Sequence, residues 1–281
     1  MDVIFTTLFF VVVIGLSGHL LGNFLSGRVR KRFTQHQWPV HEGPEPGILP
    51  RFLHFAHVFS MFALGISGMA IRFPGAFPYG AKPWMQFIHF FFMFVVVLNL
   101  FWRLWYAFLS KTRDYKEFKI KREDVTTIFQ VVLYYIFVKK SKPHIDKYNV
   151  MQKGTYIFFA ILLFAQAFTG FSLLTNLLPP STAPQAAATA WPFSPQQLFL
   201  GWFADFVGGL AVVSAWSRAV HYLINWLFII LTTIHAYLSI TEDFPAFRHF
   251  FGLGGHEEHD AHADHGGVHP GGPLADAGVE H

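Results

Sequence analysis

Residues 215–240, AWSRAVHYLINWLFIILTTIHAYLSI, form an apolar stretch with a histidine toward each end. His221 and His235 are fourteen residues apart, which on an α-helix is a rise of about 21 Å and comes within about 40° of a whole number of turns. Both imidazoles therefore leave the same face of one helix, at two depths. Such a helix is long enough to cross a bilayer, where ionisable groups are costly and usually functional. The stretch thus predicts two sites, one near each side of a membrane.

The composition of the chain is that of an integral membrane protein. Of its 281 residues, 53% are hydrophobic and 14% are charged, whereas soluble domains carry about 25% charged residues. The chain has no cysteine, which excludes thiolate-bound iron–sulfur clusters, thioether-linked haem, disulfides and thiol catalysis. Its basic residues cluster beside apolar stretches and form no single patch, so they indicate topology and not nucleic-acid binding. Any redox centre must be held by histidine or methionine.

Five apolar stretches are long enough to span a bilayer. They cover residues 3–25, 51–72, 84–109, 150–178 and 215–240. A cleaved signal peptide is the alternative interpretation of the first stretch, but its basic residues follow the apolar run instead of preceding it. Residues 125–138 and 196–213 are expected to form helices at the membrane interface. The predicted fold is an all-α integral membrane protein with five spans, a four-helix bundle plus one extra N-terminal transmembrane helix.

The distribution of lysine and arginine predicts the orientation. The connections after the first and third spans hold four and ten of these residues, whereas those after the second and fourth hold two and none. Connections rich in basic residues stay in the cytoplasm. We therefore expect a multi-pass membrane protein whose N-terminus faces out and whose C-terminus is cytoplasmic.

Four histidines sort into two pairs once the spans are oriented. His54 and His235 lie about one turn inside the cytoplasmic ends of the second and fifth spans. His89 and His221 lie at the opposite level. A six-coordinate b-type haem takes two axial imidazoles from the protein, so the pairs predict two b haems, one near each side of the membrane. His57 is an alternative ligand to His54, and histidines that only hydrogen-bond in helix packing are the competing interpretation.

Small and basic residues near the pairs fit this interpretation. Glycine lets a flat macrocycle approach a helix, and we expect this role for Gly65, Gly68, Gly154 and Gly170. Guanidinium groups at span ends can pair with haem propionates. The candidates are Arg51 and Arg218, with Arg72 and Arg103 in similar positions. Each of these arginines is equally an anchor of its helix at the membrane surface.

The chain divides into four parts on this interpretation. They are the extra helix at 1–26, a cytoplasmic linker at 27–50, the di-haem four-helix domain at 51–250 and a tail at 251–281. The tail has too little apolar content to fold alone. Its histidines recur every third residue and could bind nickel or zinc, but a disordered tail or a cloning remnant is the favoured interpretation, because such a run has no preorganised ligand geometry. These histidines are His256, His259, His262 and His265.

Several motifs follow one another between residues 51 and 243. Arg51-Phe-Leu-His54 opens the second span, which ends in Ile66-Ser-Gly68, and His89 comes early in the third. Lys147-Tyr-Asn-Val-Met-Gln-Lys153 precedes a span with Thr169-Gly170, and His221 and His235-Ala-Tyr237 follow. In these motifs the chain resembles the di-haem cytochrome b subunits that anchor periplasmic respiratory enzymes, chiefly the formate dehydrogenase gamma subunit and the nickel–iron hydrogenase b-type cytochrome. The first span and the tail lie outside the resemblance.

The resemblance implies roles for individual residues. His54 and His235 would bind the cytoplasmic-side haem, and His89 and His221 the outer haem. The Tyr-Asn-x-x-Gln-Lys run resembles a menaquinone pocket, in which an asparagine amide can donate to a quinone carbonyl; this nominates Asn149, Gln152, Lys153 and His235. Capping of the fourth span is the alternative role of Asn149. The chain departs from the family pattern at Phe55, Phe90 and Met151, where relatives commonly have tryptophan, proline and glycine.

The resemblance implies a membrane-anchoring electron-transfer subunit of the bacterial inner membrane, with its N-terminus in the periplasm. It would take electrons from an iron–sulfur subunit and a catalytic subunit of the hydrogenase or formate dehydrogenase type on the periplasmic side. It would pass them through two b haems and reduce menaquinone from the quinone pool near the cytoplasm. One alternative reverses the flow, with quinol as donor to a thiosulfate- or polysulfide-type reductase. Another is a haem-free transporter or proton channel that uses the histidines as a relay.

Overall fold

The computed structural model describes residues 2–36, 38, 47–111, 113–141, 150–174, 201–204, 206–242 and 244–251. Within these ranges five helices are long and apolar enough to cross a membrane. They are α1 (Asp2–Leu25), α2 (Ile48–Arg72), α3 (Ala81–Phe108), α5 (Val150–Ser172) and α8 (Leu210–Glu242). The described residues form helices and connections and no strand. The prediction of an all-α membrane fold with five spans is therefore confirmed.

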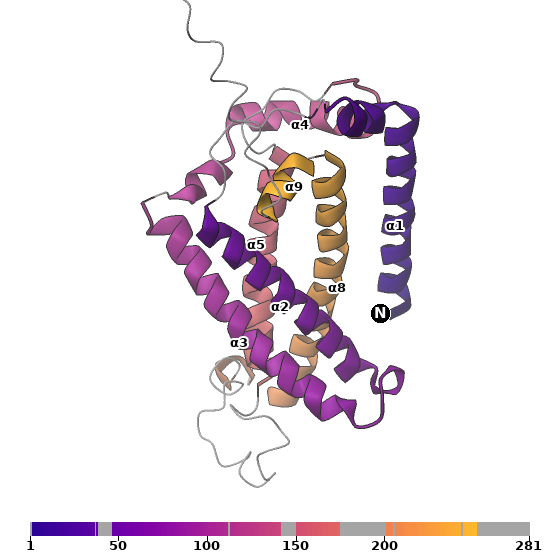
Figure 1. Ribbon diagram of the computed structural model, residues 1–281. Helices are drawn as coiled ribbons and strands as arrows, with labels where there is room; N and C mark the ends of the chain where they lie inside the picture. Colours follow the sequence, from indigo (N-terminus) through magenta and orange to yellow (C-terminus); the bar gives the residue numbers. More distant parts are fainter. Residues whose placement is uncertain are drawn as a thin grey trace, which may run out of the picture.

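Two pairs of adjacent helices make up the bundle (Figure 1). α2 and α3 run in opposite directions and are joined by a short connection that contains the 3₁₀ turn η2 (Pro74–Ala76). Gly80 directly precedes α3 with φ of 80°, a left-handed conformation that glycine adopts without a steric penalty. α5 lies along α8, where Leu162, Ile224 and Phe228 form a buried apolar cluster. α1 lies on the other side of α8 from α5.

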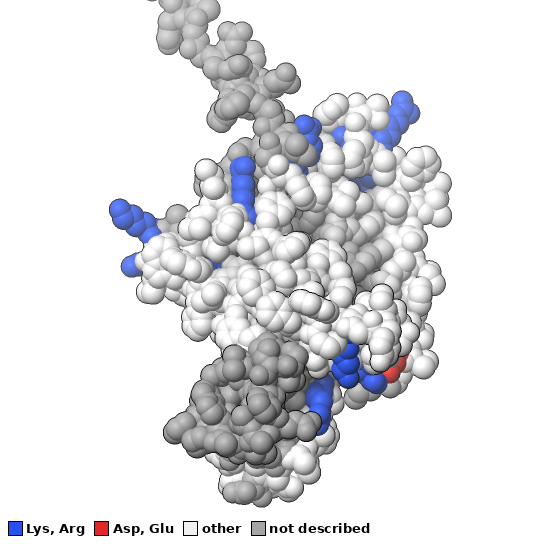
Figure 2. Space-filling model, turned by 60° about the horizontal axis from the view of Figure 1, so that its bottom comes forward, with Lys and Arg blue, Asp and Glu red and all other residues white. Residues whose placement is uncertain are grey.

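Short helices close one end of the bundle, and we call it the basic end. α4 (Arg122–Tyr135) lies across it in Figure 1, and the π-helix η1 (Arg30–Thr34), the turn η3 (Asp114–Phe118) and α9 (Phe244–Phe250) lie at the same end. α4 covers most of the stretch 125–138, where an interfacial helix was expected, and its location at the membrane interface stays a prediction. The opposite end, which we call the far end, carries η2. The face of the protein in Figure 2 is largely uncharged over its described residues, and its lysines and arginines lie mostly toward the two ends, as an apolar membrane slab requires.

The expected interfacial helix at 196–213 differs from the structure. Of its described residues, 201–204, 206 and 207 are helical, but Gly208 and Gly209 interrupt the helix with φ of 96° and 103°. These positive φ angles are open to glycine and strained for other residues. α8 begins at Leu210 and is therefore longer than the predicted span.

α1 is fastened to the bundle at both ends. At the far end the carboxylate of Asp2 accepts hydrogen bonds from Arg72 at 3.1 Å and from the hydroxyl of Tyr222 at 2.6 Å. At the basic end the guanidinium of Arg32 donates to both carboxylate oxygens of Glu242, each at 2.9 Å. The Arg32 and Glu242 residues are 4% exposed, so this bidentate pair is buried.

The buried position of Arg32 does not neutralise it. Burial alone would lower the pKa of Arg32, but the adjoining Glu242 carboxylate outweighs burial and raises it. A second buried arginine, Arg28, donates to the backbone carbonyls of Tyr134 at 3.0 Å and of Lys139 at 2.8 Å. Residues that we expected to form a cytoplasmic linker therefore attach α1 to α4 and α8.

Candidate haem-binding sites

One predicted histidine pair is brought together at the far end. The ring centres of His89, on α3, and His221, on α8, are 6.3 Å apart. Metal–imidazole bonds of about 2 Å, and about 1 Å more from each ring nitrogen to its ring centre, separate two axial imidazole centres by about 6 Å. The spacing of His89 and His221 therefore matches two imidazoles that share one metal ion between them.

A hydroxyl group lies against the Nδ1 atom of each ring. The Oγ atom of Ser67 is 2.9 Å from Nδ1 of His89, and Oγ1 of Thr169 is 2.9 Å from Nδ1 of His221. Both hydroxyls also donate to a carbonyl four residues back, Ser67 to Ala63 at 2.6 Å and Thr169 to Ala165 at 2.8 Å. Each hydroxyl has one proton, so its oxygen accepts from the imidazole, and Nδ1 carries the hydrogen.

This tautomer leaves the Nε2 atom of each ring as the unprotonated one. A neutral imidazole binds a metal through its unprotonated nitrogen, and a hydrogen bond at the other nitrogen fixes the ring orientation. At His221 the amide nitrogen of Gln166 lies 3.1 Å from Nε2, which agrees with an acceptor at that atom. The amide of Gln166 has to turn away when a metal takes its place.

Glycine opposite each ring keeps room for it. A Cβ atom added at Gly68 would lie 3.4 Å from Cε1 of His89, and one added at Gly170 would lie 3.4 Å from Cε1 of His221. At Gly65 and Gly154 an added Cβ would meet no heavy atom within 4 Å. A side chain at Gly68 or Gly170 would therefore crowd a histidine of the far-end site. One at Gly65 or Gly154 would enter open space.

The second predicted pair lies at the basic end. His54 lies near the start of α2, and His235 lies in the second half of α8. The ring of His235 packs against Tyr156 at 6.1 Å and Phe159 at 6.3 Å, both on α5. The choice of His54 over His57 as the partner of His235 stays a prediction.

α9 lies beside one member of the basic-end pair, His54. The ring of Phe250 lies 5.1 Å from that of His54, and Phe251 lies 4.9 Å from Phe55. Aromatic side chains directly after the last span therefore pack on the first turns of α2. In the described part of the chain no group of three or more His, Cys, Asp or Glu residues could hold a metal ion. Pairs of histidines suit haem in particular, because the porphyrin supplies the other four nitrogens.

The four arginines at span ends have different surroundings. Arg72 bonds Asp2, as described above, and its guanidinium also lies 5.1 Å from the ring centre of Phe73. Arg103 lies over the ring of Tyr106 at 5.7 Å. Arg51 is half-buried at the basic end, and Arg218 is exposed one turn before His221. A propionate-binding role of Arg51 and Arg218 stays a prediction.

The predicted quinone residues are only partly described. Asn149 lies outside the described residues, and Gln152 is half-buried in the first turn of α5. Lys153 is 1% exposed and its ammonium donates to the carboxylate of Asp124, on α4, at 2.8 Å. It also donates to the carbonyl of Lys119 at 3.4 Å. A quinone that bound Lys153 would therefore contact a lysine that is already paired with Asp124.

Asp124 is a residue that the sequence reasoning missed. Burial alone would raise the pKa of the Asp124 carboxyl, but the backbone N–H of Lys121, at 2.7 Å, and the ammonium of Lys153 together lower it. An acidic residue three positions after the start of a helix is a recognisable capping signal. That signal places Asp124 at the start of α4, but it does not reveal the contact with Lys153.

Comparison with known proteins covers most of the chain. The family described as "Prokaryotic cytochrome b561" matches residues 47–252. A similar protein is the "Probable Ni/Fe-hydrogenase B-type cytochrome subunit" of Rhizobium leguminosarum bv. viciae, which is 23% identical over 219 residues, covering 73% of this chain and 81% of that protein. No solved structure matches the chain. The match begins at residue 47, so α1 and η1 lie outside it.

Proposed function

Because this chain belongs to the prokaryotic cytochrome b561 family, it is a multi-pass b-type cytochrome of electron transfer, and we propose that it carries electrons across the membrane to menaquinone. His89 and His221 hold one b haem at the far end, and His54 and His235 hold a second at the basic end. The main support is the geometry of the far-end pair, with ring centres 6.3 Å apart and Nδ1 of each ring on a hydroxyl.

The haem irons, when bound, supply one-electron redox centres at two levels of the bundle. The contribution of the protein is to present neutral imidazoles with a fixed proton position. Ser67 and Thr169 accept the Nδ1 hydrogens, and this increases the basicity of the nitrogens that face the metal. Of the four histidines, His89, His221 and His235 are half-buried and His54 is exposed.

The orientation follows from the basic residues. Exposed Arg30, Lys31 and Lys116 lie at the end where His54 and His235 pair, and lysine and arginine are enriched on the cytoplasmic side of membrane proteins. The basic end is therefore the cytoplasmic end, in the inner membrane of a bacterium, and electrons enter at the far, periplasmic end.

The electron donor is a hydrogenase with an iron–sulfur subunit. The support is the similar Ni/Fe-hydrogenase cytochrome subunit from Rhizobium; a formate dehydrogenase type of donor is the second possibility that the sequence motifs leave open. Menaquinone takes up electrons and cytoplasmic protons beside Asn149, Gln152, Lys153 and His235. The buried pair of Lys153 and Asp124 fixes the start of α5 against α4 at this site.

Purified protein in liposomes tests this function. With a chemical reductant outside and menaquinone in the bilayer, we expect menaquinone reduction that Asn149→Ala and Gln152→Ala slow while haem content stays unchanged. Thr155→Ala is the matched control, because the Thr155 hydroxyl donates to the carbonyl of Met151 in the same helix, at 2.8 Å. Equal reduction rates in Asn149→Ala, Gln152→Ala and wild type would reject the quinone site.

A further inference from the structure

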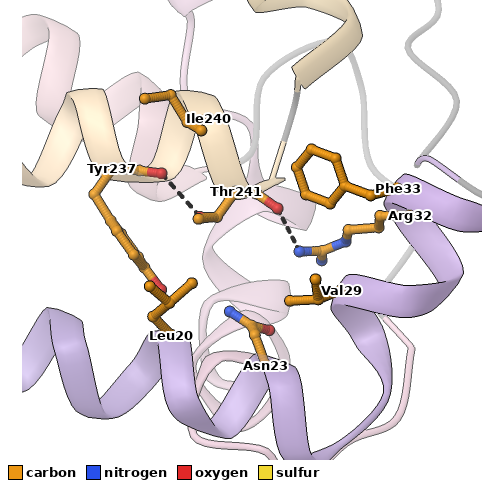
Figure 3. Close-up of a pocket in the computed structure, with 8 residues that line it drawn as sticks. All are labelled: Leu20, Asn23, Val29, Arg32, Phe33, Tyr237, Ile240 and Thr241. Carbon is orange, nitrogen blue, oxygen red and sulfur yellow. Dashed lines mark hydrogen bonds between the residues drawn. The ribbon is translucent and has the colours of Figure 1, made fainter.

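A cavity of about 280 Å³ lies between α1, η1 and the end of α8 (Figure 3). Leu20 and Tyr237 lie at one side of it, and Phe33 and Arg32 lie at the other. Two residues along a helix are about 200° apart, so His235 is on the other side of α8 from Tyr237. The cavity is therefore separate from the haem and quinone sites proposed above. Its lining residues are Leu20, Asn23, Val29, Arg32, Phe33, Tyr237, Ile240 and Thr241.

The polar residues of the cavity wall bond one another or their neighbours. Arg32 donates to the carbonyl of Thr241 at 2.5 Å, and the hydroxyl of Thr241 donates to the carbonyl of Tyr237 at 2.8 Å. The hydroxyl of Tyr237 and the amide nitrogen of Asn23 lie 2.6 and 3.2 Å from Nδ1 of His19. The surface that the wall presents to the cavity is almost wholly apolar. A cavity of this kind excludes water and accepts hydrocarbon.

An apolar trough of about 400 Å³ adjoins the cavity and shares Leu20 and Val29 with it. Leu21 and Phe24 also line the trough and are 58% and 69% exposed, so it opens toward the lipid. With Ser17 and Leu20 they form one stripe along α1, which covers a rise of about 10 Å. The trough therefore follows the axis of a membrane-spanning helix, the direction in which the tail of a membrane lipid lies.

Two basic residues lie at the end of the trough that is nearest the membrane surface. Val29 forms that end, and Arg30 and Lys31 follow it in the chain with exposed side chains. Neither side chain forms an ion pair with another of the described residues. Lysine and arginine beside a membrane surface attract anionic lipid headgroups. An anionic headgroup would therefore meet two cations next to an apolar trough.

Shape and charge distinguish a lipid from other occupants of the bilayer. A transmembrane helix is about 10–12 Å wide with its side chains and cannot enter the cavity beside the trough, whereas a hydrocarbon chain can. The tail of a quinone is thin enough as well, but its uncharged head would gain nothing from Arg30 and Lys31. An anionic phospholipid matches both the apolar walls and the basic residues.

We propose that the cavity and the trough bind one tail of an anionic phospholipid, whose headgroup phosphate lies on Arg30 and Lys31. The lipid packs between α1 and α8, in the stretch between the attachments of α1 at Asp2 and at Arg32. It completes the packing of a helix that precedes the residues matched to the family. The site includes none of the residues proposed to hold haem or quinone.

Lipid retention by the haem-loaded, full-length chain tests the proposal. The protein is incubated in nanodiscs of phosphatidylcholine and phosphatidylglycerol, washed in detergent, and the lipid that stays bound is counted by mass spectrometry. We expect wild type to keep one phosphatidylglycerol per chain. In the double variant Arg30→Gln, Lys31→Gln the preference for phosphatidylglycerol over phosphatidylcholine should fall about thirtyfold, the factor expected for two basic residues at an anionic surface.

The control for charge is the double variant Lys116→Gln, Arg122→Gln. It removes two exposed basic residues at the same end of the bundle, from η3 and from the start of α4. It should keep phosphatidylglycerol like wild type, because neither residue is near the trough.

A second pair of variants tests the shape of the site. Leu20→Trp fills the junction of the cavity and the trough and should abolish retention of phosphatidylglycerol. Leu8→Trp is the control, since Leu8 is 43% exposed and about 120° around α1 from Leu20, and it should retain the lipid. The haem spectra of all variants should be unchanged.

Several results would overturn the site. One is equal retention of phosphatidylglycerol by wild type and Leu20→Trp, and another is the same lipid preference in wild type and in Arg30→Gln, Lys31→Gln. Menaquinone, or a second copy of the chain, held at this site in place of the phospholipid would also overturn it. Because Arg30 and Lys31 are on the surface, the charge variants give a result even where Leu20→Trp loses haem.

Discussion

Replacing Ser67 with alanine removes the oxygen that lies 2.9 Å from Nδ1 of His89 and leaves the helix otherwise intact. The hydrogen bond strengthens when the metal draws electron density from the imidazole, which is greater in the ferric state. The bond therefore stabilises ferric haem, and its loss should raise the midpoint potential of the far-end haem.

The magnitude follows from the strength of such a bond. A net contribution of about 0.5–1.5 kcal/mol is usual for one hydrogen bond, and a bond stronger by about 0.7 kcal/mol in the ferric state corresponds to about 30 mV, since about 1.4 kcal/mol is 59 mV for one electron. We expect Ser67→Ala to raise the potential of one haem by roughly 20–40 mV and to leave the other unchanged.

Ser60→Ala is the matched control. Ser60 and Ser67 are on the same helix, are 1% and 0% exposed, and donate to carbonyls four residues back at 2.7 and 2.6 Å. Of the two, Ser67 has the histidine contact. Potentiometric titration of the reduced b-type absorption bands gives the shift. Equal potentials for Ser67→Ala and Ser60→Ala would refute the assigned proton position and the ligand role of His89.

Three further changes test other contacts. Arg32→Gln leaves Glu242 buried without its ion-pair partner, so we expect thermal unfolding to show a stability loss of about 3 kcal/mol. The control Arg30→Gln, at an exposed position, should change the stability little. Equal losses in the two variants would argue against the attachment of α1 through Arg32. In wild type the lowered pKa of Asp124 means that its stabilisation is present above the ordinary value of 3.8 and is lost as pH falls through the folded pKa. Lys153→Met should cost about 3 kcal/mol at pH 7. The deficit should be smaller near pH 4, where the buried Asp124 of the variant, which lacks its cationic partner, becomes protonated; a deficit independent of pH would contradict the pair. Gly170→Ala places a Cβ 3.4 Å from His221 and 3.9 Å from the sulfur of Met93, so we expect this variant to retain less haem. In the control Gly18→Ala the added Cβ has nothing within 4 Å, so haem content should equal that of wild type. Equal haem content in the two variants would count against the site.

The sequence predicted the spans and the levels of the histidines because both depend on length along a helix. α2, α3 and α5 begin within a few residues of the expected positions, and the fourteen-residue spacing put His221 and His235 at opposite ends of α8. The short helix α4 followed from an apolar run too short to span a membrane.

The contacts around the histidines could not be predicted, because they depend on how neighbouring helices are rotated. Ser67 and Thr169 were visible as parts of motifs, but their hydrogen bonds to His89 and His221 require the packed bundle. The same holds for Lys153, whose partner Asp124 lies on a helix that crosses the end of the bundle.

The basic residues after α1 show a different limit. Their number predicted that this loop lies on the cytoplasmic side of the membrane, and for that prediction only the positive charge of the loop matters. Their individual partners were beyond reach, because Arg28 and Arg32 bond α4 and α8, more than a hundred residues away in the chain. The cavity beside α1 depends on those contacts.

The ratio of haem to polypeptide tests the central claim most directly. Quantification of b haem in purified wild type should give two haems per chain, two in His57→Ala, and at most one in each alanine variant of His54, His89, His221 and His235. A wild type with fewer than two haems would contradict the account. So would His89→Ala or His221→Ala protein that keeps both haems.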